Sequence, residues 1–230
     1  MNQTCRKSQE ERTKEWIADR LRAADLAPPA IRDFDQAADQ ILCFIREIQR
    51  WNPKVRLTSE GDETSILERH FYDSLHFARV LPGARDAMDI GSGNGFPGIP
   101  LKIIFPETRM VLVESRRKRA NFLREVVRKL NLENISVAEG RAERLAGDGA
   151  FAGCFDAVLF RAVAGLEDCL SLGAPYLRPG GRIVVKKDAD AKAVPFEISP
   201  GLALSLADEI SIRSWSGVES KLMVFQKCST

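Results

Sequence analysis

Asp89-Ile-Gly-Ser-Gly-Asn-Gly-Phe-Pro-Gly98 is the stretch of this sequence that decides the fold. Its alternating glycines follow an acidic residue and lie between a short apolar stretch, Ala87-Met88, and an apolar run that begins at Ile99. This pattern predicts a strand, a tight turn and the start of a helix. Glycine accepts positive φ and lets the backbone approach a ligand closely, so the turn is a candidate cofactor site.

On both sides of this turn, strand-like and helix-like segments alternate. Runs of Val, Ile and Leu without polar alternation predict strands buried on both faces, as in a parallel sheet between helix layers. The last two β-rich runs are joined by only five residues, so they should pair antiparallel. The sequence predicts an α/β fold with a seven-stranded, mostly parallel sheet and an antiparallel terminal strand. The predicted strands are 87–90, 110–114, 135–138, 155–160, 182–186, 210–215 and 221–226, and the predicted helices are 97–105, 116–130 and 165–177.

A helical extension precedes this core. Apolar residues recur every three to four positions between Ala38 and Ile48, which predicts an amphipathic helix, and a separate helix is expected over about 12–25. Pro53 should end the second helix at Asn52, which becomes a candidate cap. We expect residues 1–83 to form this extension and residues 84–230 the core, as one globular unit.

A third helix is predicted from Ser65 to about Val80. Ser65-Ile-Leu-Glu68 has the spacing of a capping box. Arg69 and Asp73 are four residues apart and should pair on its surface. His70 is expected to make a structural hydrogen bond, and Trp51 to pack the extension on the sheet.

Composition narrows the functional classes. No stretch of about 18 apolar residues occurs, so we expect no membrane span, and the polar start lacks a secretory signal. The five cysteines are scattered without a C-x-x-C pair, which argues against zinc or disulfides and favours the cytoplasm. Because the net charge is only +2, a nucleic-acid partner needs a local basic patch. We expect a monomer without metal.

The glycines fit two cofactor classes. Gly93-Asn-Gly95-Phe-Pro-Gly98 matches the dinucleotide fingerprint. The run from Asp89 through Gly91, Gly93 and Gly95 matches the loop of class I S-adenosylmethionine (SAM) methyltransferases. Glu114 ends the next strand, 19 residues after Gly95, where a ribose-binding acid belongs in both folds.

Three features favour SAM. The Asp89 carboxylate can meet the methionine ammonium, whereas a dinucleotide has no cation there. Pro97 removes an N–H group from the helix start that would bind a pyrophosphate. The antiparallel pair of strands at the end of the chain is typical of class I methyltransferases.

The glycine run and several further motifs resemble the RsmG (GidB) family of bacterial 16S rRNA methyltransferases. Gly95-Phe-Pro-Gly-Ile-Pro100 is the most specific of them, and the resemblance covers roughly residues 38–187. Three positions depart from the family pattern: Arg56, Phe160 and Lys187. The other matching motifs are Trp51-Asn-Pro-Lys-Val-Arg-Leu-Thr58, Arg69-His-Phe-Tyr-Asp-Ser-Leu75, Lys118-Arg-x-x-Phe-Leu123, Asn134-Ile, Gly140-Arg-Ala-Glu143 and Arg161-Ala.

The resemblance implies SAM-dependent methylation of N7 of one guanosine in 16S rRNA, within small-subunit particles. It also implies SAM contacts at Gly91, Phe96, Ala142, Glu143 and Arg161. Because N7 carries a free lone pair, we expect no general base and no catalytic dyad. Two rival functions remain: a non-catalytic SAM-binding ribosome-assembly factor, and a dinucleotide-dependent oxidoreductase.

Basic side chains should follow the RNA phosphates. Four consecutive cations begin a predicted helix at Arg116, where the helix dipole disfavours positive charge, so an external anion is expected there. The first candidates are Arg116, Arg117, Lys118, Arg119, Arg124 and Lys186, and the others are Lys54, Arg56, Arg69, Arg128, Lys129 and Lys187.

Overall fold

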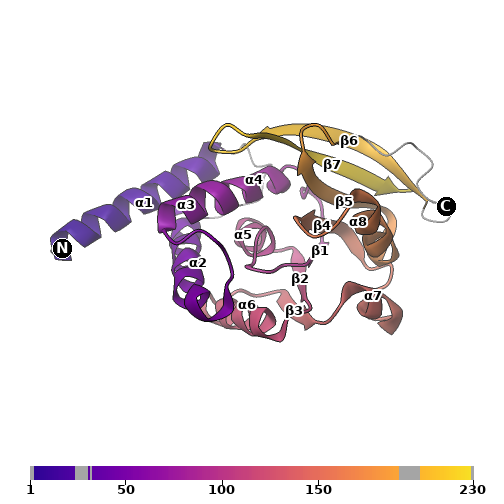
Figure 1. Cartoon of the computed structure of the whole chain (residues 1–230), viewed down its shortest axis with the longest axis horizontal. Coiled ribbons are helices and arrows are strands. Elements are labelled where there is room, and N and C mark those ends of the chain that lie inside the picture. The colour runs from indigo at the N-terminus through magenta and orange to yellow at the C-terminus, as the bar shows by residue number, and fades with distance from the viewer. Residues whose placement is uncertain (1–2, 24–30, 32, 192–202, 229–230) are drawn as a thin grey trace.

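The fold is built on one twisted, seven-stranded sheet (Figure 1). A computed structural model describes the chain except for residues 1–2, 24–30, 32, 192–202 and 229–230. The strand order is β3-β2-β1-β4-β5-β7-β6, and every pair is parallel except those that β7 makes. The strands are β1 (Asp86–Ile90), β2 (Arg109–Glu114), β3 (Ile135–Glu139), β4 (Phe155–Arg161), β5 (Leu177–Asp188), β6 (Leu204–Arg213) and β7 (Glu219–Lys227).

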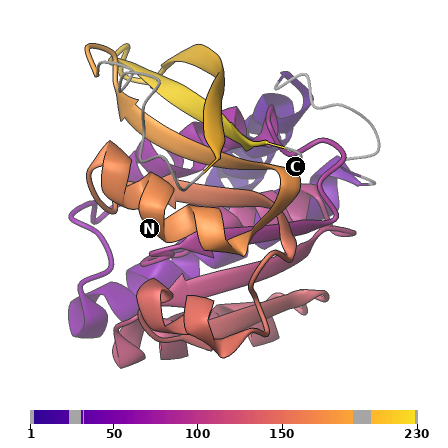
Figure 2. The same cartoon turned by 90° about the vertical axis from the view of Figure 1, so that its right-hand side faces the viewer.

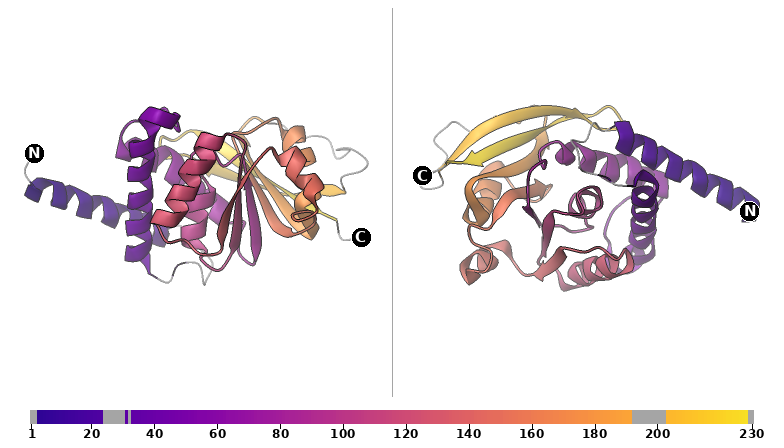
Figure 3. Two further views of the ribbon diagram at one scale, coloured as in Figure 1. Left: turned by 90° about the horizontal axis from the view of Figure 1, so that it is seen from below. Right: turned by 180° about the vertical axis from the view of Figure 1, so that it is seen from behind.

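Helices cover both faces of the sheet (Figure 3). Alternate residues of one strand point to opposite faces, so Leu112 joins one apolar cluster with α2, α4, α5 and α6, and Val113 joins another with α8. In Figure 2, α8 lies in front of the sheet. The helices are α1 (Gln3–Ala23), α2 (Phe34–Val55), α3 (Glu63–Ile66), α4 (Tyr72–Ala78), α5 (Gly98–Ile104), α6 (Arg117–Lys129), α7 (Ala142–Leu145) and α8 (Leu166–Gly173).

This architecture confirms the predicted α/β class and the antiparallel terminal strand. β7 lies between β5 and β6, with Val184 opposite Val224 in the antiparallel pair. The predicted helix over 165–177 is shorter, because a 3₁₀ turn at Ala174–Tyr176 separates α8 from β5. None of the helices described is long and apolar enough to cross a bilayer.

The helical extension packs directly on the core. Ile17 of α1 belongs to the same apolar cluster as Leu112 of the sheet. Trp51 contacts Phe122 of α6 at 5.9 Å between ring centroids, so it packs α2 on a helix of the core rather than on the sheet. A division of the chain at residue 83 stays a prediction, since residues on both sides share this cluster.

The predicted start of the first helix and the predicted end of the second were also wrong. α1 begins at Gln3 rather than at about residue 12. α2 continues through Pro53 to Val55, although Pro53 has no N–H to donate to the carbonyl of Gln49, and Arg56 then takes the left-handed conformation. The Asn52 side chain does cap this end, since its Oδ1 accepts from the N–H groups of Leu57 and Thr58 at 2.7 and 3.0 Å.

The third helix begins at Glu63, two residues before the predicted start at Ser65. Asp62, not Ser65, is the N-cap, and its carboxylate accepts from the Ser65 N–H at 2.8 Å. A π-helical turn at Leu67–Phe71 follows before α4. This wider turn changes which side chains share a face, so the predicted Arg69–Asp73 surface pair was wrong. Arg69 pairs with Glu60 instead, and Asp73 is buried.

Candidate functional site

The glycine turn lies at the carboxyl end of β1, against the end of β2. The N–H groups of Gly91 and Ser92 both donate to the carbonyl of Val113, at 2.9 and 3.0 Å. Gly91, Gly93 and Gly95 have φ of 76°, 53° and 91°, a region that side chains with a Cβ rarely adopt. The sequence therefore placed the turn correctly, at the edge where parallel sheets bind ligands.

Asp89 lies beneath this turn rather than at its surface. The residue is 1% exposed, and its Oδ2 accepts from the Gly98 N–H at 3.2 Å. Burial raises the pKa of this carboxyl to about 7. The bond ties β1 to the first residue of α5, so Asp89 holds the turn in shape from below.

Glu114 ends β2 beside the turn. Its Oε2 accepts from the Gly93 N–H at 3.0 Å, and its Oε1 accepts from the Arg116 N–H at 2.7 Å. One carboxylate therefore joins the glycine turn to the start of α6. This places Glu114 where the sequence expected a ribose-binding acid, and that role stays a prediction.

Ala142 and Glu143 begin the short helix α7, which follows β3 and was not predicted. Ala142 is buried, and its carbonyl accepts a hydrogen bond from the Tyr176 hydroxyl, whereas Glu143 is exposed. Both follow the carboxyl end of their strand, as Gly91 follows β1 and Glu114 ends β2. The predicted cofactor residues therefore lie along one edge of the sheet.

Arg161 ends β4 and reaches across to the helical extension. Its Nη2 donates to His70 Nδ1 at 2.6 Å and to the Arg69 carbonyl at 3.3 Å. Its guanidinium carbon lies 5.9 Å from the ring centroid of Phe96, and the His70 ring stacks on the same ring at 5.3 Å. The predicted contact residues Phe96 and Arg161 therefore come together at the glycine turn.

Of the network of polar side chains around Arg161, the sequence predicted only that His70 makes a hydrogen bond, which the structure confirms. Because His70 Nδ1 accepts from Arg161, its proton lies on Nε2, which faces Glu60 Oε2 at 3.0 Å. Burial and the Arg161 charge lower the pKa of His70. Burial alone would raise the pKa of Glu60, but hydrogen bonds from Thr58, the backbone and His70 lower it to about 2.

Asp73 completes this network. Its Oδ2 forms an ion pair with Lys186 of β5 and lies 3.5 Å from Arg161 Nη2. The motif from Arg69 to Leu75 was the sequence signal for His70 and Asp73, but its helical spacing predicted a surface pair of Arg69 with Asp73. Only the packing of α4 against the sheet shows that Asp73 faces two strand ends.

The basic candidates divide into free and occupied side chains. Arg116, Arg117 and Lys118 are exposed at the start of α6, beside Glu114. Arg119 donates to the Arg56 carbonyl at 3.1 Å, and Arg124 pairs with Glu139 at 2.9 Å. The remaining first candidate, Lys186, is held by Asp73 and its side chain is only 19% exposed.

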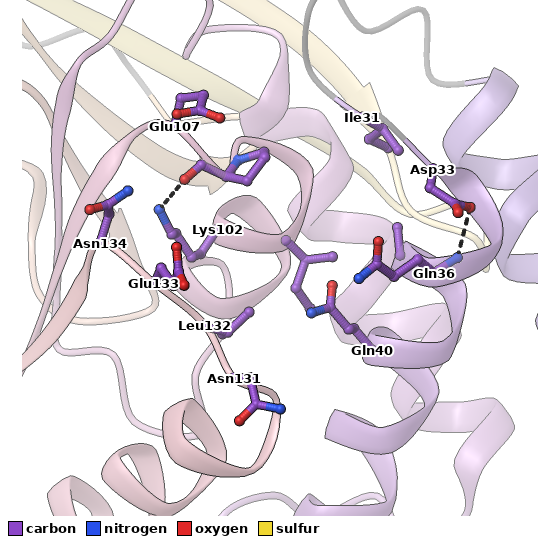
Figure 4. A pocket seen from close by; sticks show the side chains of 13 residues that line it. Ile31, Asp33, Gln36, Gln40, Lys102, Glu107, Asn131, Leu132, Glu133 and Asn134 are labelled. Carbon is purple, nitrogen blue, oxygen red and sulfur yellow. Dashed lines mark hydrogen bonds between the residues drawn. The ribbon is translucent and has the colours of Figure 1, made fainter.

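A cavity of about 290 Å³ lies at the opposite edge of the sheet, where β2 and β3 begin (Figure 4). Lys102 lines it and donates to the carbonyls of Pro106 and Thr108 at 2.7 and 2.6 Å. Burial lowers the pKa of this lysine to about 8. The cavity shares no residue with the glycine turn, so its shape says nothing about the candidate site.

Comparison with known proteins gives one consistent result for the sequence. The sequence model of the family described as GidB, rRNA small subunit methyltransferase G, matches residues 37–198. A ribosomal RNA small subunit methyltransferase G of Brevibacillus brevis is 35% identical over 216 residues, which cover 93% of this chain and 84% of that protein. The Streptococcus gordonii protein of the same name is 37% identical over 171 residues, covering 72% and 71% of the two chains.

Solved structures support the same fold. An O-methyltransferase from Bacillus cereus in complex with SAH aligns with a TM-score of 0.57 and 17% identity, covering 94% of this chain and all (100%) of that one. A putative O-methyltransferase from Klebsiella pneumoniae aligns with a TM-score of 0.56 and 13% identity, covering 80% and 90% of the two chains. At these identities the likeness concerns the fold alone.

Proposed function

Because the chain belongs to the GidB family of rRNA small subunit methyltransferase G, we propose that it methylates N7 of one guanosine in 16S rRNA. Family and fold together make it a SAM-dependent methyltransferase. The dinucleotide-dependent oxidoreductase is thereby set aside. The observation that carries the proposal is the glycine turn at the carboxyl edge, with Glu114 beside it and Arg161 across it.

The donors and acceptors at this edge fit SAM. The Glu114 carboxylate can accept from ribose hydroxyls, and the Arg161 guanidinium can donate to the methionine carboxylate. Gly91 has a φ of 76°, and the Val163 side chain fills the place where a Cβ would lie, so the turn needs glycine at this position to keep its shape. Since Asp89 is 1% exposed, its charge acts on the methionine ammonium from beneath the turn rather than by open contact.

In the proposed reaction the protein has to position the base and the methyl group, and it does not have to transfer a proton. SAM supplies a methyl group on a sulfonium, and the N7 lone pair forms the new bond while the sulfur keeps the electrons of the bond that breaks. N7 of neutral guanosine carries no proton, so no residue has to act as general base. The chain must hold the base in line with the methyl group, about 3–3.5 Å away.

We propose that rRNA phosphates bind the exposed cations at the start of α6. Arg116, Arg117 and Lys118 lie beside Glu114, so RNA bound there approaches the same edge of the sheet. Arg124 and Lys186 are engaged in ion pairs and serve this role less well. The protein would work as a monomer on small-subunit particles in the cytoplasm.

Methyl transfer from labelled SAM to small-subunit particles tests this function. The particles come from cells that lack the protein, and the modified nucleotide is mapped by mass spectrometry of the rRNA. We expect one N7-methylguanosine, and no label with the Gly91→Glu variant. SAM binding without label in the RNA would support the non-catalytic assembly factor, and stabilisation by NAD alone would exclude both.

A further inference from the structure

Asp73 and Lys186 form a nearly buried ion pair beside the proposed methyl-transfer site. Their side chains are 7% and 19% exposed. Lys186 lies two residues before the end of β5, in register with Arg161 at the end of β4, and Asp73 reaches both from α4. Arg161 in turn lies 5.9 Å from the Phe96 ring of the glycine turn. The pair is therefore one strand away from the groups proposed to hold the cofactor.

One oxygen of this carboxylate has no partner. Both cations approach Oδ2, whereas Oδ1 is buried and accepts no hydrogen bond from any described residue. A buried acceptor without a donor lowers stability, so native proteins rarely keep one without a reason. Rotation about the Cβ–Cγ bond of aspartate is soft, and either oxygen can turn toward an incoming donor. The orphan oxygen thus points to a ligand that donates a hydrogen bond.

The pair presents a donor and an acceptor side by side. The Lys186 ammonium donates, and the free oxygen of Asp73 accepts. Guanine carries the complementary order on adjacent atoms, with O6 as acceptor and N1–H as donor. Adenine carries the reverse order, an amino group at C6 and a lone pair at N1, so it would place donor against donor and acceptor against acceptor.

We propose that Asp73 and Lys186 read the target base as guanine, with Lys186 donating to O6 and Asp73 accepting from N1–H. This inference rests on the proposed guanine-N7 methylation and changes the role of Lys186 from a phosphate contact to a specificity residue. O6 and N7 are neighbours on the same side of guanine, so a base held at O6 by β5 presents N7 toward the end of β4. The carboxylate also offsets the lysine charge, which would otherwise oppose the cationic methylated base.

The surrounding network keeps Arg161 from competing for the pair. His70 Nδ1 accepts from Arg161 at 2.6 Å, a much shorter contact than the 3.5 Å from Arg161 to Asp73. Glu60 holds the other nitrogen of the His70 ring at 3.0 Å. Arg161 is thereby fixed toward the glycine turn, and Asp73 remains available to Lys186 and the base.

The test compares Lys186→Met with the wild-type protein on small-subunit particles that carry guanosine or 2-aminopurine at the methylated position. 2-Aminopurine keeps N7 but lacks both O6 and N1–H. We expect the wild type to prefer guanosine in kcat/KM, and the variant to lose about 10- to 100-fold of this preference. The preference of each protein is its kcat/KM on guanosine divided by its kcat/KM on 2-aminopurine. A difference in intrinsic reactivity between the bases affects both proteins equally, so it cancels when the two preferences are compared. Inosine, which keeps O6 and N1–H, should be preferred over 2-aminopurine by the wild type in the same way.

Lys221→Met is the matched control. Lys221 lies on β7, pairs with Glu209 at 3.0 Å and has a side-chain exposure of 14%, so the same substitution removes a similar ion pair outside the site. Its base preference should equal that of the wild type. Asp73→Asn provides a second variant, which should also lose base preference while binding SAM with unchanged affinity.

The outcomes separate the two proposals. If the wild type methylates guanine N7 and Lys186→Met keeps the full preference for guanosine, the base-reading role is refuted and the function stands. If the wild type transfers no methyl group to guanine N7, the proposed function itself fails. A loss of SAM affinity in Lys186→Met equal to its loss of activity on both bases would show a merely structural pair, and would also refute the inference.

Discussion

Gly98→Ala tests how closely the glycine turn and α5 must approach β1. A Cβ at Gly98 would lie 2.4 Å from Leu112 Cδ2 and 2.7 Å from Asp89 Oδ2. Leu112 is 0% exposed and Asp89 1% exposed, so neither can move aside into solvent. Overpacking of a core costs about 1–3 kcal/mol, and loss of the Gly98–Asp89 hydrogen bond costs about 1.5–3 kcal/mol. We expect the free energy of unfolding to fall by about 3–5 kcal/mol.

Urea denaturation followed by circular dichroism measures this loss, and the melting temperature should fall by roughly 10 °C. Gly147→Ala is the control, because Gly147 is exposed and its added Cβ meets nothing within 4 Å. Its free energy of unfolding should stay within about 0.5 kcal/mol of the wild type. Equal stability of the two variants would show that the close contact at Asp89 is not what requires glycine at this position.

Three further outcomes are expected. Gly91→Glu should fold with a loss of about 1–2 kcal/mol, because its φ is 76° and its Cβ would meet Val163 at 2.7 Å, but calorimetry should detect no SAM binding. Burial raises the pKa of Asp89 from 3.8 to about 7, so its contribution to stability is present below pH 4 and lost as the pH rises to 7. Urea denaturation at each pH gives the free energy of unfolding. Between pH 4 and 7 this free energy should fall by up to about 4 kcal/mol more in the wild type than in Asp89→Asn, and an equal fall in both proteins would contradict this. Arg117→Glu with Lys118→Glu should weaken RNA binding and lower the salt slope by about one to two, whereas Arg12→Glu on α1 should leave the slope unchanged.

Local sequence patterns predicted most of the fold. The unbroken apolar runs identified the strands, and the short connection before Lys221 identified the antiparallel hairpin. The glycine turn and Glu114 were placed correctly because strand, turn and helix follow one another within the chain. The sequence signals for helix ends gave the wrong residue at two places. Pro53 lies inside α2 instead of ending it, and Asp62 rather than Ser65 caps the third helix.

The polar network around Arg161 could not be predicted from spacing. Glu60, His70 and Asp73 come from the extension, and they meet Arg161 and Lys186 only because the packed helices bring them to the ends of β4 and β5. A π-helical turn inside the motif then rotates Asp73 away from Arg69 and into the protein.

By itself, the sequence determined the fold class, the glycine turn and the family, because each depends on residues that lie close together in the chain. Only the tertiary structure decided which charged side chains are buried or paired and which are exposed to solvent. Asp89 is held beneath the turn and Lys186 is held by Asp73, while Arg116 and Arg117 remain exposed. Burial and pairing set the state of a charged group, and both depend on contacts between segments that are distant in sequence.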